Sequence, residues 1–240
     1  MSAIKEYYHN DIETGMRFPR EKERPIIFST PMVKAILESV KIQTRRIIKP
    51  QPIKKDVFWE LYGAAWSEDH GYIPCMPGHS LSTRNPYGQN EDLLWVRETF
   101  MYSHFYPDNG QVVIKYKAGG QRLIENYPYW ILNKNLNKWK PSIHMPKAAA
   151  RIWLKISEIG IERLQDITEE QAIAEGVGSG CHVNAVWPDY INMKTGLCST
   201  ARKSFASLWK SINGPESWDN NPWVWVIHFR IINELNNKII

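Results

Sequence analysis

Two stretches of alternating side chains constrain the fold of this chain most strongly. In RIWLKISEI, residues 151–159, Ile152, Leu154 and Ile156 occupy every second position. In NPWVWVIHFRII, residues 221–232, aromatic and aliphatic side chains also recur at every second position. Alternation with a period of two over such lengths is typical of β-strands with one buried face. The first stretch therefore predicts a half-buried strand, and the second predicts a final strand with one face formed by Trp223, Trp225, Ile227, Phe229 and Ile231.

Three helices are predicted between the strands. Thr30 is a suitable N-cap and Pro31 suits the first helical position, so a helix is expected to begin there. In ITEEQAIAEGV, residues 167–177, Thr168 and Gln171 have the spacing of a capping box, and Gly176 suits a left-handed stop. The third helix, ARKSFASLWKSI, is amphipathic and is expected to end at the Asn-Gly pair that follows it.

The order of the predicted elements indicates an α+β fold. Further strands are expected at 24–29, 42–49, 93–102 and 111–117. The order shows no internal repeat and no βαβ rhythm, which favours a closed or nearly closed mixed β-barrel with a few helices packed outside it. We expect residues 1–23 to be an N-terminal extension. Residues 24–235 are expected to form one domain, with long loops or insertions at about 51–90 and 117–147.

Composition narrows the class of protein. The 240 residues are 43% hydrophobic and 23% charged, as in ordinary soluble globular proteins. Cys75, Cys181 and Cys198 have no CxxC spacing, which argues against a disulfide framework or a structural zinc site, so a reducing cytoplasm is the expected location. No apolar run is long enough to span a membrane, and no membrane association is expected. A net charge of +5, with eleven Trp and eleven Tyr, is compatible with an acidic, stacking partner such as nucleic acid.

The segment VKAILESVKIQTRRIIKPQP, residues 33–52, holds the first candidate site. The hydroxyl of Thr44 is a poor nucleophile until a base removes its proton. Lys41 can be that base only if burial or nearby cations lower its pKa, and Arg45 and Arg46 supply such cations. In an extended segment Thr44 and Arg46 share one face, and Lys41 lies at the junction where the chain can turn it toward them.

Three further residues have both a functional and a purely structural interpretation. Glu175 precedes Gly176 at the predicted helix C-terminus, where the macrodipole disfavours a carboxylate, which suits a proton-exchanging group. It can equally be an exposed glutamate without a role. Trp95 and Arg97 share one face of a predicted strand and can hold a base by stacking. Alternatively, Trp95 belongs to the core and Arg97 pairs with a carboxylate.

Five segments, in this order, resemble the ASCH domain family, a branch of the PUA-like superfamily. They are RPIIFSTPMVKAILESVKIQTRR, DLLWVRETF, PSIHMPKAAARIWLKI, ERLQDITEEQAIAEGV and NPWVWVIHFR. The resemblance is to the larger phage and prophage members and covers about 24–62 and 88–232. It implies a PUA-like mixed β-barrel with a cleft flanked by helices, which binds RNA or a modified nucleoside or nucleotide.

The resemblance also implies roles for individual residues. One branch of the superfamily hydrolyses N4-acetylcytidine with a Lys, Thr and Glu set, and Lys41, Thr44 and Glu175 occupy similar positions. By this analogy Thr44 attacks the acyl carbonyl, Lys41 activates it, and Glu175 shuttles a proton or orients the lysine. Arg45, Arg46, Trp95 and Arg97 are the expected nucleic-acid or substrate contacts. We expect no metal and no cofactor.

Other functions remain open at the level of sequence. In a non-catalytic RNA-binding module, Lys41, Arg45 and Arg46 would contact phosphate and Thr44 would only donate a hydrogen bond. A basic cleft can also position a phosphodiester for a ribonuclease. A phage protein that sequesters a host factor is a further alternative. The sequence leaves the substrate and the oligomeric state open.

Overall fold

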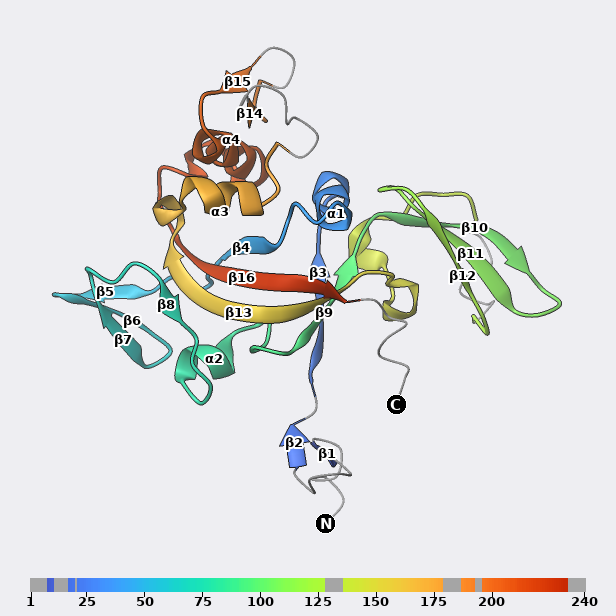
Figure 1. Ribbon diagram of the computed structural model, residues 1–240, viewed down its shortest axis with the longest axis horizontal. Coiled ribbons are helices and arrows are strands. Elements are labelled where there is room, and N and C mark those ends of the chain that lie inside the picture. Colours follow the sequence, from blue (N-terminus) through green and yellow to red (C-terminus); the bar gives the residue numbers. More distant parts are fainter. Residues whose placement is uncertain are drawn as a thin grey trace.

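A curved central sheet organises the protein. The computed structural model describes residues 8–10, 17–19, 21–127, 136–178, 187–192 and 196–232. Within these ranges, six strands form one mixed sheet in the order β3-β9-β13-β16-β4, with β8 also paired to β13. The two longest strands, β13 (Trp153–Arg163) and β16 (Trp223–Ile232), pair antiparallel along their whole length. Figure 1 shows them curving together through the middle of the molecule. The two strands predicted from alternation are therefore confirmed.

The remaining strands of this sheet are shorter. β3 (Glu23–Ile27) runs parallel to β9 (Leu93–Arg97), and β4 (Gln43–Ile47) pairs antiparallel with β16. β8 (Ile73–Pro74) pairs with the middle of β13. In the described ranges β3 and β4 are the two ends of the strand order and do not pair with each other, so the sheet is not a closed barrel. The α+β class is confirmed.

Residues 51–90, predicted as a long loop or an insertion, contain regular secondary structure and are not one continuous loop. β5 (Ile53–Lys55), β6 (Phe58–Leu61) and β7 (Ala64–Ser67) form a three-stranded antiparallel sheet, and α2 (Ser80–Arg84) follows β8. Strands of three or four residues are too short for a period-two pattern to stand out. The rings of Trp59 and Trp66 pack edge-on against Trp223, with centroids 5.7 and 5.2 Å away. This segment therefore belongs to the core.

A second small sheet lies at the other end of the central sheet (Figure 1). It contains β10 (Phe100–Tyr106), β11 (Gln111–Tyr116) and β12 (Gln121–Ile124) in that order, so the single strand predicted at 93–102 is in fact the two strands β9 and β10. After β12, the described part of the 117–147 segment includes the 3-10 helix η2 (Ser142–His144), and η3 (Lys147–Ala149) begins at its end. Two short pairs complete the strands: β1 (Tyr8–Asn10) with β2 (Arg17–Pro19), and β14 (Trp187–Pro188) with β15 (Leu197–Cys198). Cys181 lies outside the described residues.

The three predicted helices are present. α1 (Thr30–Leu37) begins one residue earlier than expected: Ser29 is its N-cap, without a side-chain cap hydrogen bond, and Thr30 is already helical. α3 (Glu169–Ala174) has the predicted capping box between Thr168 and Gln171. α4 (Ala201–Asn213) ends at Gly214, and η4 (Leu164–Asp166) and η5 (Pro215–Ser217) are 3-10 turns. Over the described ranges, none of the helices is both long and apolar enough to span a membrane.

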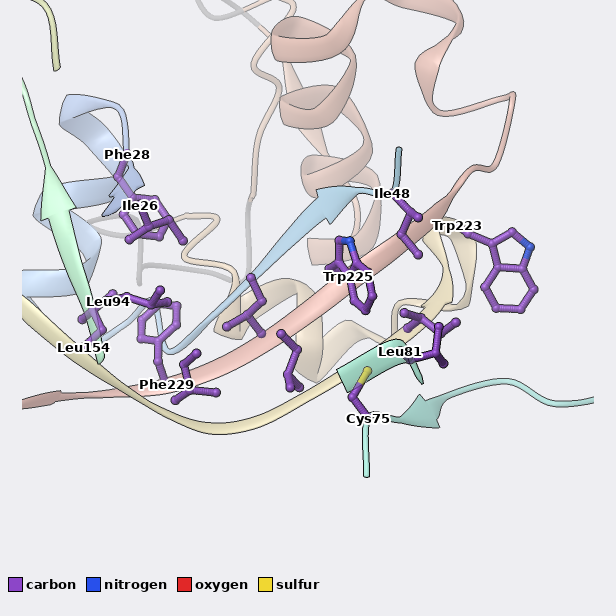
Figure 2. Close-up of a cluster of buried hydrophobic side chains, with 14 of the residues drawn as sticks. Ile26, Phe28, Ile48, Cys75, Leu81, Leu94, Leu154, Trp223, Trp225 and Phe229 are labelled. Carbon is purple, nitrogen blue, oxygen red and sulfur yellow. The ribbon is translucent and has the colours of Figure 1, made fainter. Parts of the chain in front are cut away.

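Apolar side chains cover both faces of β16. On one face Trp225 and Phe229 join the core cluster with Leu94 and Leu154 from neighbouring strands (Figure 2). On the other face Val224 and Val226 pack in a second cluster that includes residues of α3 and α4. β16 is thus buried on both faces for most of its length, because α4 packs over the face opposite the first core cluster.

Candidate functional site

A cavity of about 350 Å³ lies at the β4 end of the central sheet. β4 and the residues after it form one wall, α4 forms another, and single residues from α1, the segment after α2 and the end of α3 complete it. The lining residues are Met32, Thr44, Arg45, Arg46, Ile47, Lys49, Tyr87, Glu175, Phe205, Leu208, Trp209, Ile212 and Asn213.

The register of β4 against β16 decides which way the site residues point. Thr44 pairs with Ile227 and Arg46 with Trp225, both of which belong to the first core cluster. Arg45 pairs with Val226, which faces α3 and α4. Directly paired residues of antiparallel strands point to the same face. Thr44 and Arg46 therefore share a face, as predicted, and Arg45 points the opposite way.

Lys41 and Glu175 are in direct contact although 134 positions separate them in the chain. The Lys41 ammonium donates to Glu175 Oε2 at 2.7 Å and to the Glu175 carbonyl oxygen at 2.8 Å. Both residues are buried, with exposed fractions of 1% and 5%. The Ile42 amide also donates to the Ala174 carbonyl at 3.0 Å, which ties the end of α3 to the start of β4. This convergence was expected only from the family resemblance.

Burial changes the proton affinity of Lys41. Loss of solvent lowers the pKa of the Lys41 ammonium below its ordinary value, since a low-dielectric surrounding disfavours the charged form. The carboxylate of Glu175 opposes this effect, and the positive charges of Arg46 and Arg45 add to it. The direction is the one that a lysine base requires.

The guanidinium of Arg45 is occupied by protein acceptors. Its Nε donates to Glu162 Oε1 at 2.7 Å, Nη1 to Glu175 Oε1 at 3.0 Å, and Nη2 to Gln171 Oε1 at 3.1 Å. Arg45 thus links two carboxylates to α3, so its geometry suits positioning of Glu175 more than direct contact with a ligand.

Glu162 is a site residue that the sequence reasoning missed. It lies on β13, is 2% exposed, and forms an ion pair with Arg45. Burial raises the pKa of the Glu162 carboxyl, and Arg45 partly reverses that shift. A carboxylate among the isoleucines of ISEIGIERL was the available signal, because a charge in a buried strand requires a partner.

Arg46 is bound very differently from its neighbour. Its Nη2 donates to the Ile27 carbonyl at 2.7 Å, and its guanidinium carbon lies 5.1 Å from the centre of the Phe28 ring. Its Nε is buried and has no hydrogen-bond acceptor among the described residues. Burial lowers the pKa of Arg46, while Tyr87 and Glu175 oppose that effect. The cavity wall therefore contains a cation with unused donor capacity.

Thr44 also lines this cavity. Thr44 is 2% exposed, and no described residue makes a hydrogen bond to its side chain. Thr44 and Glu175 therefore border the same cavity.

Aromatic side chains form part of the wall and were not predicted as site residues. Tyr87, Phe205 and Trp209 all line the cavity. The indole Nε1 of Trp209 is buried and finds no acceptor in the described part of the chain. The amphipathic pattern of α4 predicted its buried face, but nothing local showed that this face borders a cavity.

Trp95 and Arg97 lie away from this cavity. The Arg97 guanidinium carbon lies 5.5 Å from the centre of the Trp95 ring, so the two share a face as predicted. Trp95 packs against the cluster that contains Phe100, and Arg97 donates to the Ile143 carbonyl. The structure thus places Thr44, Arg45, Arg46 and Glu175 on the cavity lining, with Lys41 bound to Glu175, and leaves the pair of Trp95 and Arg97 elsewhere.

In the described ranges, no three His, Cys, Asp or Glu side chains gather closely enough to hold a metal ion. The chain matches no family model, no curated protein and no solved structure. Its function is therefore inferred from the residues around this cavity and from the motifs that resemble the ASCH family.

Proposed function

We propose that this chain is an ASCH-type, PUA-like protein that binds a nucleobase in the β4–α4 cavity and hydrolyses an N-acylated cytosine nucleoside. The observation that carries the proposal is the buried contact between Lys41 and Glu175, 2.7 Å long, beside a cavity lined by Thr44. A hydroxyl nucleophile, a lysine of lowered pKa and a carboxylate that orients it together have the parts of an amide hydrolase.

The walls of the cavity suit an aromatic ring. Tyr87, Phe205 and Trp209 offer stacking or edge contacts, which are tolerant of base identity. The unpaired Trp209 N–H can donate to a carbonyl or ring nitrogen of a base. A volume of about 350 Å³ lies at the lower end of the range for small-molecule sites, roughly 300–1,000 Å³. One nucleoside therefore fits this cavity better than several stacked nucleotides.

In the proposed reaction, Thr44 Oγ1 adds to the carbonyl carbon of the N-acyl group while neutral Lys41 accepts the hydroxyl proton. The tetrahedral intermediate then collapses, the bond from the carbonyl carbon to the exocyclic nitrogen breaks, and Lys41 returns the proton to the departing amine. Water next cleaves the threonyl ester and releases the carboxylic acid. Glu175 holds Lys41 in place and stabilises its protonated form during the first step.

A non-catalytic binding module is the second candidate. Arg46 and Lys49 line the cavity, and neither forms an ion pair with a carboxylate of the described residues. Such cations favour an anionic ligand whether or not chemistry follows. In this case Thr44 only hydrogen-bonds the ligand.

Turnover of N4-acetylcytidine by wild type, Thr44→Val and Thr44→Ser tests the proposal. Valine keeps the shape of threonine without the hydroxyl, so we expect kcat/KM to fall by at least about 10³-fold. Serine keeps a hydroxyl and should retain measurable turnover. Cytidine affinity, measured by calorimetry, should change little in either variant.

Three outcomes would contradict hydrolysis by this scheme. Equal turnover by wild type and Thr44→Val would exclude Thr44 as the nucleophile. A folded wild type that binds cytidine but releases no acetate would support the binding module. Cleavage of a labelled RNA that survives Thr44→Val would instead indicate a ribonuclease.

A further inference from the structure

The charges around the cavity do not balance. Two cations, Lys41 and Arg45, are neutralised by two carboxylates, Glu175 and Glu162. Two more cations line the cavity: Arg46 on β4 and Lys49 just after it. Arg46 and Lys49 therefore add two positive charges to one wall that no carboxylate of the described residues pairs with.

Of these two unpaired cations, Arg46 gives the stronger indication of an anionic ligand. Its guanidinium donates to the neutral Ile27 carbonyl, and its buried Nε has no acceptor within the described ranges. Arg46 as a whole is half-buried, but its Nε is removed from solvent, and a buried N–H donor normally has an acceptor because an aromatic face does not replace the lost hydration in full. An anionic ligand group in the cavity would supply the missing acceptor, and guanidinium groups bind phosphate with two parallel hydrogen bonds.

We infer that the ligand of this cavity carries a phosphate monoester, so that the substrate is a nucleoside monophosphate held by Arg46 and Lys49. This inference rests on the proposed function, since it concerns the same site. A phosphate monoester carries a charge of about −1.5 to −2 at neutral pH, which matches the two positive charges of Arg46 and Lys49. The cavity volume of about 350 Å³ favours one mononucleotide over a polymer.

The test compares cytidine with cytidine 5′-monophosphate as ligands of the full chain by calorimetry at low salt. For wild type we expect the monophosphate to bind about 10- to 100-fold more tightly than cytidine. A gain of this size is what hydrogen bonds between charged groups typically contribute to binding. Arg46→Gln and Lys49→Gln should each reduce that ratio, and the double variant should bring it close to 1. Cytidine itself should bind all variants alike.

A control variant and a pH series separate a local contact with the phosphate from a general charge effect. Lys115→Gln removes the same charge from an exposed position on β11, away from the cavity lining, and should leave the ratio unchanged. Lys49 is exposed, so its substitution keeps the inference testable even if Arg46→Gln fails to fold. Below pH 6 the ratio should shrink in wild type, because the phosphate loses its second charge there.

The outcomes distinguish this inference from the proposed function. Equal affinity for cytidine and its monophosphate would overturn the phosphate subsite and leave the nucleoside hydrolase intact. Binding of neither compound would overturn both. A short RNA without a terminal phosphate that binds more tightly than the monophosphate would overturn the mononucleotide and indicate a polymer ligand.

Discussion

Arg45 and Arg46 are adjacent in sequence but differ in what their guanidinium groups contact. Successive residues of a strand point to opposite faces, so Arg45 enters the space under α3, where Glu162 and Glu175 lie. Arg46 lies beside Phe28 and Tyr87, where no carboxylate of the described residues pairs with it. One arginine is therefore part of the framework of the site, and the other is available to a ligand.

Substitution of each arginine by glutamine should separate these roles. Arg45→Gln leaves Glu162 buried without its cation, which should lower the free energy of unfolding by about 3 kcal/mol. Arg46→Gln loses one hydrogen bond to a carbonyl and should lower it by about 1 kcal/mol. Urea denaturation of both variants measures the difference. Equal losses would show that Arg46 also holds the fold together.

The pH dependence of turnover should follow Lys41. Only the neutral amine accepts a proton from Thr44, and burial lowers the Lys41 pKa below its ordinary value of 10.5. After subtraction of the uncatalysed rate, the kcat/KM for N4-acetylcytidine should therefore rise with pH and then reach a plateau. The midpoint of this rise should give an apparent pKa below 10.5. Lys41→Arg should be inactive throughout, because arginine stays protonated. A rate that falls with rising pH would contradict a lysine base.

At the scale of elements, the end of α3 decides whether the site can assemble. Gly176 follows Glu175 with a φ of +86°, and a Cβ there would lie 2.9 Å from Lys41 Cβ and 3.0 Å from Ala35 Cβ. Only glycine permits both the left-handed backbone and this close approach of α1 and the Lys41 segment. The helix stop thus also sets the distance between Glu175 and Lys41.

Gly176→Ala should be more harmful than the same change at Gly63, in the turn between β6 and β7. Left-handed strain and the close contacts together should lower the free energy of unfolding by about 3 kcal/mol, and turnover should fall with it. Gly63→Ala is the matched control, because Gly63 has a φ of +84° but no neighbour within 4 Å, and about 1 kcal/mol is expected. Similar unfolding curves for the two variants would show that the space around Gly176 is unimportant.

At the scale of the whole molecule, the 51–90 segment completes the core. Trp59 and Trp66 pack against Trp223 at the start of β16, the strand that carries β4 on its edge. A segment that looks like an insertion in the sequence therefore supports the strand on which the site is built.

Trp66→Ala tests this role. Trp66 is 7% exposed, and its loss should lower the free energy of unfolding by about 3–5 kcal/mol through lost burial and a cavity beside Trp223. Trp139→Ala removes an indole that is 47% exposed and should change stability by less than about 0.5 kcal/mol. Thermal or urea unfolding of both variants checks the prediction. A mild effect at Trp66 would mean that the small sheet is only loosely attached.

The elements that depend on near neighbours were predictable from sequence. Alternation identified β13 and β16, and the capping box and Gly176 identified both ends of α3, because hydrogen bonds and steric limits within a few residues decide these features. Short strands such as β5 and β6 were not predicted, since a strand of three or four residues is too short to show a clear alternating pattern. The N-cap of α1 was misplaced by one residue because Ser29 and Thr30 are both good caps.

The same distinction between local and long-range features applies to the candidate site. The sequence alone determined that Thr44 and Arg46 share a face, because strand geometry fixes the direction of alternate side chains. Only the tertiary structure decided that Lys41 meets Glu175, that Arg45 is held by Glu162, and that Arg46 is left without an anionic partner. Those contacts depend on how β4 docks beside β16 and beneath α3 and α4, and such long-range docking follows from the packing of the whole core.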